Sequence, residues 1–443
     1  MRVLVLVDGE HYPPVTRWGI EVARSRGHEV VAALFLGGTE KVDPTALPDL
    51  GLPTLSAGAD IRAALAEALD DVRPEAVLDL SDEPVVGYRE RMELAAVSLV
   101  RGIPYLGPDF RLDPPISGPP LRCPTVAVIG TGKRTGKTAI GGEVARVAEA
   151  MGRNPIVVAM GRGGPPEPQV ARAGTVTLDG LLDLVRRGEH AASDYLEDAV
   201  TSGVTTIGAR RAGGGMAGAP FASNVREAAE LAVNLGAGLV ILEGSGSAVP
   251  PVPWDAGILA VPVSAPPEYL GGYLGPYRLL LSDLVVLTMT GSPITGPENL
   301  LALTSHVQRI RGDARVVVTD LQPVPLGDVR GKEAFFTTTA PQAVAAKQVA
   351  SLEASFGCRV VGWSARLADR SGLMEDLERA EAYEVLLTEL KAAAVDVACE
   401  RATARGATVV FVDNRPLAVD AGTNLPDLLA ETMDLAVKRH EAR

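Results

Sequence analysis

The sequence is poor in cysteine and has no long apolar run. Its 443 residues include only three cysteines, Cys123, Cys358 and Cys399, which stand far apart in no CxxC or Cys/His pattern. This spacing predicts neither a disulfide framework nor a zinc site, so we expect reduced thiols and a cytoplasmic protein. No stretch of about 18 apolar residues occurs, which argues against a membrane span and predicts no membrane partner.

Aromatic residues make up only 4% of the chain, so the core must be built mainly from valine, leucine, alanine and isoleucine. Together with 47 glycines, this composition favours an α/β protein with many tight turns between strands and helices. Basic residues are outnumbered, and the net charge of −13 argues against nucleic-acid binding, which needs a broad basic surface. An anionic small molecule remains compatible, because a local cluster of arginine and lysine can overcome the global charge.

Alternating strand and helix patterns divide the chain into three blocks. Residues 1–120 are predicted to form an N-terminal Rossmann-like α/β domain that contributes to substrate binding, and residues 121–325 a parallel-sheet P-loop NTPase domain. Residues 326–443 are predicted to form either a C-terminal α/β domain or an extension of the central sheet. A proline-rich segment, Asp109–Cys123, is expected to be the stiff linker between the first two blocks.

Short apolar runs bounded by turn residues predict buried strands, and apolar residues at helical spacing predict the helices between them. The expected strands are Val3–Val7, His28–Phe35, Ala76–Leu80, Thr125–Ile129, Ile156–Met160, Leu239–Leu242, Leu284–Leu287, Val316–Thr319, Ala334–Thr337, Val360–Trp363 and Thr408–Val412. The expected helices are Val15–Arg26, Ile61–Val72, Thr138–Met151, Asn224–Leu235 and a long one over Tyr383–Ala404.

A glycine-rich loop follows the expected strand Thr125–Ile129. It reads Gly130-Thr131-Gly132-Lys133-Arg134-Thr135-Gly136-Lys137-Thr138, and an amphipathic helix follows it. Glycines let the backbone wrap a phosphate, and the positive end of the helix faces the anion. The strict P-loop motif has glycine five residues before Gly136, where this chain has Thr131, so the loop is a variant.

We therefore predict that residues 130–138 bind ATP with Mg²⁺. Lys137 is expected to reach the β- and γ-phosphates as a catalytic cation, and the Thr138 hydroxyl to bind Mg²⁺. Lys133 and Arg134 either are solvated side chains on the turn or stabilise the charge on a transferring phosphoryl group, which would also make them catalytic.

A second apolar run, Leu239–Leu242, ends in an acid and a flexible turn, Glu243-Gly244-Ser245-Gly246. A carboxylate at the carboxyl end of a strand beside the P-loop strand is placed to hold Mg²⁺ or its water shell. We predict that Glu243 is a metal ligand; the alternative is an acid that only meets solvent at the strand end.

These two motifs resemble those of the dethiobiotin synthetase and cobyrinate amidase branch of P-loop proteins, where the loop reads GTxxxxGKT and the later motif VEGAGG. The resemblance covers the central block and implies that Thr138 and Glu243 share the Mg²⁺. It also implies a homodimer. Ser247 follows where the glycine region of that motif continues, so the loop after Glu243 is expected to differ.

A closer resemblance, to the cyclic 2,3-diphosphoglycerate synthetase family, covers nearly the whole chain. It is carried by Asp8-Gly9-Glu10-His11-Tyr12-Pro13-Pro14, by the loop Gly130–Thr138 with its Lys-Arg insert, and by Pro323–Arg330 leading to Phe336-Thr337-Thr338. It implies an ATP-dependent ligase that closes an internal phosphoanhydride in 2,3-diphosphoglycerate and releases ADP and phosphate. In both resemblances, ATP activates an oxyanion that is then attacked from within the same molecule.

Such a small phosphorylated substrate carries about five negative charges and needs several cations or helix N-termini around it. Arg162, in a glycine- and proline-rich loop, is expected to be both catalytic and substrate-binding because it follows the strand next after the P-loop helix. The other predicted substrate residues are Arg210 and Arg211 beside a glycine run, Asp8, Glu10 and His11 after the first strand, and Arg89 and Arg91 after the strand Ala76–Leu80.

Two other functions compete with the ring-closing synthetase. A 2-phosphoglycerate kinase would make 2,3-diphosphoglycerate without releasing free phosphate. A nucleotide-switch GTPase or metallochaperone-like protein of the same branch usually needs an NKxD-like segment to recognise guanine. After Leu284–Leu287 the chain reads Thr288-Met289-Thr290-Gly291, which lacks that segment.

Overall fold

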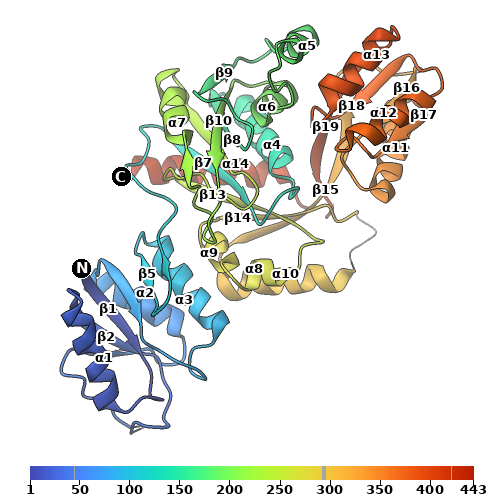
Figure 1. Cartoon of the computed structure of the whole chain (residues 1–443). Helices are drawn as coiled ribbons and strands as arrows, with labels where there is room; N and C mark the ends of the chain where they lie inside the picture. Colours follow the sequence, from blue (N-terminus) through green and yellow to red (C-terminus); the bar gives the residue numbers. More distant parts are fainter. Residues whose placement is uncertain (44, 292–295, 421) are drawn as a thin grey trace.

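The computed structural model describes residues 1–43, 45–291, 296–420 and 422–443, and it has the predicted α/β class, with two mainly parallel sheets (Figure 1). We call the part with strands β1–β6 the N-terminal domain, the part with β7–β15 the P-loop domain, and the part with β16–β19 the C-terminal domain. Among the described residues, no helix is long and apolar enough to cross a bilayer.

The N-terminal domain is built on a six-stranded sheet in the order β3-β2-β1-β4-β5-β6, in which only the β5–β6 pair is antiparallel. Val3–Val7 are fully or almost fully buried in the central strand, as an apolar run covered on both faces requires. The elements are β1 Arg2–Val7, α1 Pro13–Ser25, β2 Glu29–Phe35, β3 Thr54–Ser56, α2 Ile61–Val72, β4 Ala76–Asp79, α3 Tyr88–Val100, β5 Tyr105–Leu106 and β6 Arg111–Leu112.

The second sheet has 13 strands and begins in the P-loop domain, in the order β11-β10-β8-β12-β7-β13-β14-β15, with β9 paired to β10. The strands are β7 Thr125–Gly130, β8 Pro155–Gly161, β9 Gln169–Ala171, β10 Thr206–Ala212, β11 Ala222–Ser223, β12 Leu239–Glu243, β13 Ala256–Pro262, β14 Leu284–Thr288 and β15 Arg315–Pro325. The helices are α4 Lys137–Ala150, α5 Leu178–Arg186, α6 Asp194–Ser202, α7 Val225–Asn234, α8 Glu268–Gly271, α9 Gly275–Leu280 and α10 Pro297–Ile310.

The same sheet continues into the C-terminal domain. The C-terminal halves of β15 and β19 pair antiparallel. From β19 the sheet continues through β18, β16 and β17, and these neighbouring strands are parallel. The last helix, α14, returns to the P-loop domain, where Leu429 and Met433 are buried in one core with Val126 and Val144. The elements are β16 Glu333–Thr337, α11 Gln342–Phe356, β17 Arg359–Ser364, α12 Arg370–Arg379, β18 Val385–Thr388, a π-helix Ala394–Cys399, α13 Glu400–Ala404, β19 Thr408–Ala418 and α14 Leu425–Glu441.

The N-terminal domain docks on the P-loop domain through helix α3, which packs against α9 (Figure 1). Leu274 and Tyr277 from the P-loop domain are buried in the same apolar cluster as Leu94 of α3. At the rim of this contact, Arg309 of α10 pairs with Glu93 at 2.7 Å. The interface therefore joins an apolar centre to a polar rim.

One expectation about the elements is wrong, and one strand was not foreseen. The long helix over Tyr383–Ala404 is instead the buried strand β18, a turn, a π-helix and the short α13. Val385–Thr388 are buried between β16 and β19, and this tertiary burial overrides the helical propensity of the leucine- and alanine-rich sequence. Arg210 and Arg211 lie on strand β10, which was not among the expected strands.

Candidate active site

The P-loop joins β7 to α4 and packs tightly around the Lys137 side chain. Lys137 Nζ donates to Gly132 O at 2.7 Å and to Thr135 Oγ1 at 3.2 Å. A Cβ atom at Gly130 would lie 2.5 Å from Thr135 Oγ1, so only glycine fits there. Gly136, with φ +88°, precedes the first turn of α4 in the left-handed region. The loop therefore folds as a compact cradle, with the lysine amine at its centre.

The amine of Lys137 lies among charged groups from several elements. Burial lowers the pKa of Lys137 to about 8. The charges of Glu243 and Asp194 raise it, and those of Arg162 and Arg211 lower it further. These groups therefore form one electrostatic cluster around the P-loop.

Thr138 is the second residue of α4, directly after Lys137, and is half-buried. The backbone carbonyl of Thr135 accepts a hydrogen bond from Thr288 Oγ1 at 2.9 Å, so the end of β14 helps to hold the P-loop in place. Lys133 and Arg134 are both exposed on its outer side, and Arg134 has φ +59°. Both predicted alternatives stay open for these two residues: solvated side chains on the turn, or cations that stabilise a transferring phosphoryl group.

Glu243 ends β12, which lies beside the P-loop strand β7, as the sequence predicted. Strand β8 lies on the other side of β12. Its side chain is buried, and Oε1 has no hydrogen-bond partner within the described structure. Burial and then the charges of Asp194 and Glu197 raise its pKa well above the ordinary value, and Lys137 opposes them. An enclosed carboxylate oxygen without a donor is a site that a cation or a proton would complete.

The helix of the P-loop makes room for this carboxylate with a glycine. A Cβ atom at Gly141 in α4 would lie only 1.6 Å from Glu243 Oε1. Gly141 stands one turn after Lys137 and Thr138, so the acid packs against the first turns of the helix that these residues begin. The close approach of α4 and β12 therefore depends on an amino acid without a side chain.

Arg162 and Arg211 converge on the loop after Glu243. A Cβ atom at Gly246 would lie 2.6 Å from one guanidinium nitrogen of Arg162 and 3.4 Å from one of Arg211. Arg211 also donates to Ser245 O at 2.9 Å. Burial and then the charge of Arg162 lower the pKa of Arg211, as expected for two cations held together. Such a pair favours a bound anion.

Arg210 has a different place from its neighbour. Successive side chains of a strand point to opposite faces, and Arg210 Nε donates to Pro165 O at 2.8 Å. Its backbone nitrogen donates to Asn224 Oδ1 at 2.6 Å. Arg210 therefore fixes the loop that carries Arg162 instead of meeting Arg211.

The hydrogen bonds and ion pairs of Asp8, Glu10, His11 and Arg91 lie within the N-terminal domain. Asp8 accepts hydrogen bonds from the backbone nitrogens of Glu10, at 2.9 Å, and His11, at 3.3 Å, and its carboxylate lies 2.9 Å from His11 Nδ1. Arg91 donates to Asp79 Oδ2 at 2.7 Å. These contacts organise the carboxyl edge of the N-terminal sheet, so a substrate role for these residues stays a prediction.

Arg89, also predicted to bind substrate, lies at the interface between α3 and α8. Its Nε donates to Gly271 O at 3.4 Å and lies 3.6 Å from Glu93. Half of the Arg89 side chain is exposed. Its described contacts belong to domain docking.

Sequence reasoning missed the acids of α6 and a lysine of the C-terminal domain. Asp194, Glu197 and Asp198 lie on α6, and Lys391 Nζ lies 2.9 Å from Glu197. The acids in the first turn of α6 follow the ordinary helix N-terminus pattern, and nothing local separates them from surface acids. Burial and then the charge of Glu243 raise the pKa of Asp198 well above the ordinary value.

Models of three domains of one family match successive parts of the chain. They are the N-terminal domain of cyclic 2,3-diphosphoglycerate synthetase over residues 2–113, its P-loop domain over 125–320 and its C-terminal domain over 325–415. These matches follow the order in which the N-terminal sheet, the P-loop strands and the C-terminal strands occur in the structure.

Full-length relatives carry the same name. The cyclic 2,3-diphosphoglycerate synthetase of Rubrobacter xylanophilus is 49% identical over 94% of this chain and 95% of its own length. The synthetase of Methanothermus fervidus is 40% identical, over 98% of this chain and 97% of its own length. That of Methanothermobacter thermautotrophicus is 41% identical, over 98% and 96%. The chain belongs to the cyclic 2,3-diphosphoglycerate synthetase family.

Proposed function

We infer that this chain is an ATP-dependent synthetase that closes an intramolecular phosphoanhydride in 2,3-diphosphoglycerate, giving cyclic 2,3-diphosphoglycerate, ADP and phosphate. The observation that carries the inference is the pair of arginines, Arg162 and Arg211, beside the P-loop lysine. A P-loop binds the phosphates of ATP with its own amides and Lys137. Two further guanidiniums at the same place provide for a second, highly anionic molecule.

The reaction needs two displacements at phosphorus. An oxygen of one substrate phosphate attacks the γ-phosphorus of ATP, and the bond to ADP breaks. An oxygen of the other substrate phosphate then attacks the substrate phosphorus that carries the transferred group. The ring closes as the bond to the transferred group breaks, and that group leaves as phosphate. Arg162, Arg211 and Lys137 would neutralise charge on the transferring group, and the rigid loop would hold the attacking oxygen in line.

We propose that Mg²⁺ binds with the nucleotide, held by Thr138 and Glu243. The unpartnered Oε1 of Glu243 and the Thr138 hydroxyl are oxygen donors, the ligand type that Mg²⁺ prefers. No group of three or more His, Cys, Asp or Glu side chains arranged to hold a metal occurs in the described ranges. This fits Mg²⁺, which usually takes one or two carboxylates and completes its shell with phosphates and water. The ion would neutralise charge on the phosphates.

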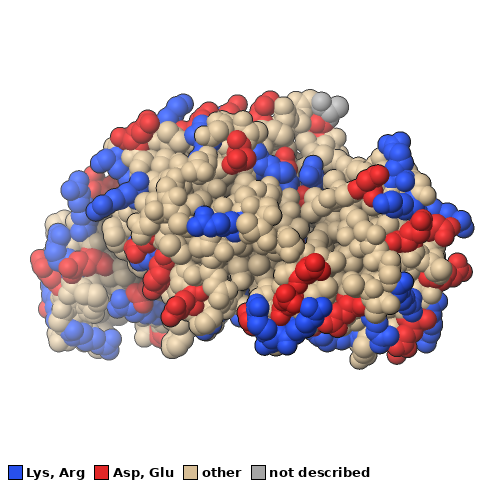
Figure 2. Space-filling model, turned by 90° about the horizontal axis from the view of Figure 1, so that it is seen from above, with Lys and Arg blue, Asp and Glu red and all other residues tan. Residues whose placement is uncertain are grey.

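We also propose that the enzyme works in the cytoplasm as a homodimer on a small phosphorylated substrate, without nucleic-acid or membrane partners. Basic and acidic side chains are interspersed on the face seen from above, which supports the absence of a nucleic-acid partner (Figure 2). Light scattering coupled to size-exclusion chromatography tests the dimer, and a monomer at micromolar concentration would contradict it.

The two competing functions are not favoured. A 2-phosphoglycerate kinase and a nucleotide-switch GTPase both fail to explain relatives named cyclic 2,3-diphosphoglycerate synthetase over almost the full chain. The segment after β14 also lacks a guanine-recognition motif.

The decisive experiment follows the phosphorus atoms. Purified protein with ATP, Mg²⁺ and 2,3-diphosphoglycerate should yield ADP, free phosphate and a cyclic product in ³¹P NMR spectra. Lys137→Ala should reduce turnover by at least about 100-fold, because a buried transition-state cation is lost. Lys438→Ala, at an exposed position of α14, is the control and should keep wild-type activity. ADP formation that does not depend on the substrate would contradict the proposed function.

A further inference from the structure

Lys391 crosses from the C-terminal domain to the P-loop domain. It lies on the turn after β18, and its Nζ is 2.9 Å from Glu197 Oε1 on α6. The side chain of Glu197 is 9% exposed, whereas that of Lys391 is 35% exposed. The lysine side chain is thus partly open to solvent, and its ammonium group has three donors, of which Glu197 accepts one.

The turn that carries Lys391 is held from both sides. Glu389 accepts a hydrogen bond from Thr339 N at 2.9 Å and from Asn414 Nδ2 at 2.8 Å. On the other side, Ala394 N donates to Lys391 O at 2.9 Å. A side chain on such a fixed turn loses less freedom when it binds a ligand, which is the usual support of a binding residue.

The carboxyl ends of two groups of parallel strands meet at this cleft. In the P-loop domain, β7, β8 and β12 end at the P-loop, at Arg162 and at Glu243. In the C-terminal domain, β18 ends at the turn with Lys391. Ligands of open α/β sheets bind outside the carboxyl ends of the strands. A molecule in this cleft would therefore face the ends of both groups.

The carboxyl group of Asp194 feels the charges of both Lys391 and the P-loop lysines. Burial raises the pKa of the Asp194 carboxyl, and the charges of Lys391, Lys137, His190 and Lys133 act in the opposite direction. Asp194 is exposed to solvent at the start of α6. The charges of four basic side chains from the two domains thus act on one carboxylate.

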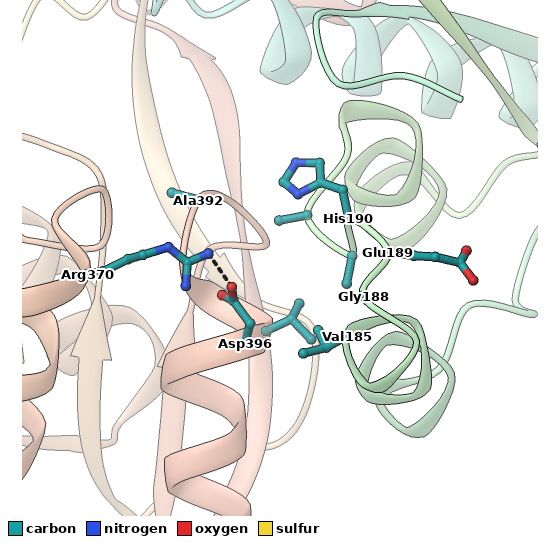
Figure 3. A pocket seen from close by; sticks show the side chains of 10 residues that line it. Val185, Gly188, Glu189, His190, Arg370, Ala392 and Asp396 are labelled. Carbon is teal, nitrogen blue, oxygen red and sulfur yellow. Dashed lines mark hydrogen bonds and ion pairs between the residues drawn. The ribbon is translucent and has the colours of Figure 1, made fainter. Parts of the chain in front are cut away.

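A cavity of about 290 Å³ lies beside the Lys391 turn (Figure 3). One wall carries His190, and the other carries Ala392, which follows Lys391, and the ion pair of Arg370 with Asp396. His190 also packs on the Arg162 loop, because a Cβ atom at Gly163 would lie 3.3 Å from its ring. This volume is at the small end for ligand sites and is compatible with a compact metabolite.

We propose that Lys391 is a substrate-binding residue, and that its ammonium group contacts a phosphate or the carboxylate of the phosphorylated substrate across the cleft from the P-loop. The C-terminal domain then supplies one wall of the substrate site. This inference rests on the proposed function, which requires a polyanion beside the γ-phosphate. Lys391 adds a cation beside Glu197, one of four acids, Asp194, Glu197, Asp198 and Glu243, that would otherwise repel that polyanion.

The alternative is that Lys391 only balances the charge of Glu197. A pair of substitutions separates the two roles. Lys391→Met alone removes the cation and leaves the Glu197 carboxylate enclosed without a counter-charge, so stability should fall. Lys391→Met combined with Glu197→Gln removes both charges, and stability should largely return. Glu389, two residues before Lys391, keeps its hydrogen bonds from Thr339 and Asn414 when the lysine is replaced.

Substrate affinity distinguishes the roles. We expect Lys391→Met to raise KM for 2,3-diphosphoglycerate at least tenfold and to change the Kd of ADP less than twofold. The double variant should recover the thermal midpoint but keep the raised KM, and Lys391→Arg should restore most of the affinity. Lys332→Met, in the same domain before β16, is the matched control and should leave KM unchanged.

A double variant with wild-type KM would overturn the proposal, since Lys391 would then act only through Glu197. Calorimetric binding of 2,3-diphosphoglycerate to the wild type and to the double variant gives the same answer without turnover. If the wild type binds the substrate but forms no cyclic product, the proposed reaction fails while the binding comparison still decides the role of Lys391. Equal affinities of the two proteins would then overturn it.

Discussion

At the scale of single residues, the sequence predicted the groups that a local motif defines. Lys137 and Glu243 lie on the elements expected for them, because a strand, a turn and a helix are encoded within a few residues. Asp194 and Lys391 escaped prediction. Both are placed by contacts between segments that are distant in sequence, and neither stands in a local motif.

Gly141 gives a residue-scale prediction. Gly141→Ala would bring a methyl group to 1.6 Å from Glu243 Oε1, so the carboxylate has to leave its place. We expect at least a tenfold loss of kcat and a weaker dependence on Mg²⁺, measured by titrating the ion in the ³¹P assay. The clash should also lower the free energy of unfolding by about 1–3 kcal/mol.

The neighbouring glycine is the control for this prediction. A Cβ atom at Gly142 would meet only the Arg146 guanidinium, at 3.5 Å, which is ordinary contact. Gly142→Ala lies in the same helix and should gain up to about 1 kcal/mol of stability from the better helix propensity of alanine. If the two variants lost activity equally, the placement of Glu243 against α4 would be wrong.

At the scale of elements, strands were predicted more reliably than the segments around them. Apolar runs such as Leu239–Leu242 mark buried strands directly. The segment Tyr383–Ala404 was predicted wrongly, because an alanine- and leucine-rich sequence favours a helix. In the folded protein, burial in the sheet makes Val385–Thr388 a strand. The strand β10 was missed because it contains a glycine, a residue that rarely predicts a strand. Its Gly208 packs against Tyr195, where a Cβ atom would lie 2.6 Å from the ring, so a strand glycine reflects close packing.

Arg146 ties the P-loop helix to the C-terminal strands. It donates to Asp413 Oδ2 of β19 at 2.9 Å and to Thr201 O at the end of α6 at 3.1 Å. Its side chain is 19% exposed and that of Asp413 only 6%. Arg146→Met would leave the Asp413 carboxylate with Arg415 alone, at 3.2 Å. We expect a loss of about 2–4 kcal/mol in the free energy of unfolding, measured by urea denaturation.

An exposed pair provides the comparison. Arg359 pairs with Glu333 at 2.9 Å, but 76% of its side chain is exposed. Water and salt screen such a pair, so Arg359→Met should change stability by less than about 1 kcal/mol. Equal losses in the free energy of unfolding for Arg146→Met and Arg359→Met would show that the buried ion pair between α4 and β19 stabilises the protein no more than an exposed pair does.

At the scale of the whole molecule, the sequence left open whether the last block is separate or extends the central sheet. In the structure, the 11-residue strands β15 and β19 pair over residues 319–325 and 412–418 and carry one sheet through both domains. Strand pairing between segments almost a hundred residues apart leaves no local trace in the sequence. The return of α14 to the P-loop core is equally non-local.

This continuity predicts that the P-loop and C-terminal domains unfold as one unit. The chain offers a direct test, because its three tryptophans, Trp18, Trp254 and Trp363, fall one in each domain. Variants that keep only Trp254 or only Trp363, with phenylalanine at the other two positions, report the two domains by fluorescence during urea unfolding. We expect coincident midpoints, because a shared sheet and the α14 core couple the domains.

Ligand binding sharpens this test. ATP binds the folded P-loop and stabilises it by mass action, by about 2.7 kcal/mol at a hundred times Kd. In one cooperative unit, the midpoint reported by Trp363 in the C-terminal domain must rise as much as that reported by Trp254, although no P-loop residue lies in β17. A lower Trp363 midpoint that ATP does not move would mean that β15 and β19 join two independent domains, and the substrate wall formed by Lys391 could then open without disturbing the nucleotide site.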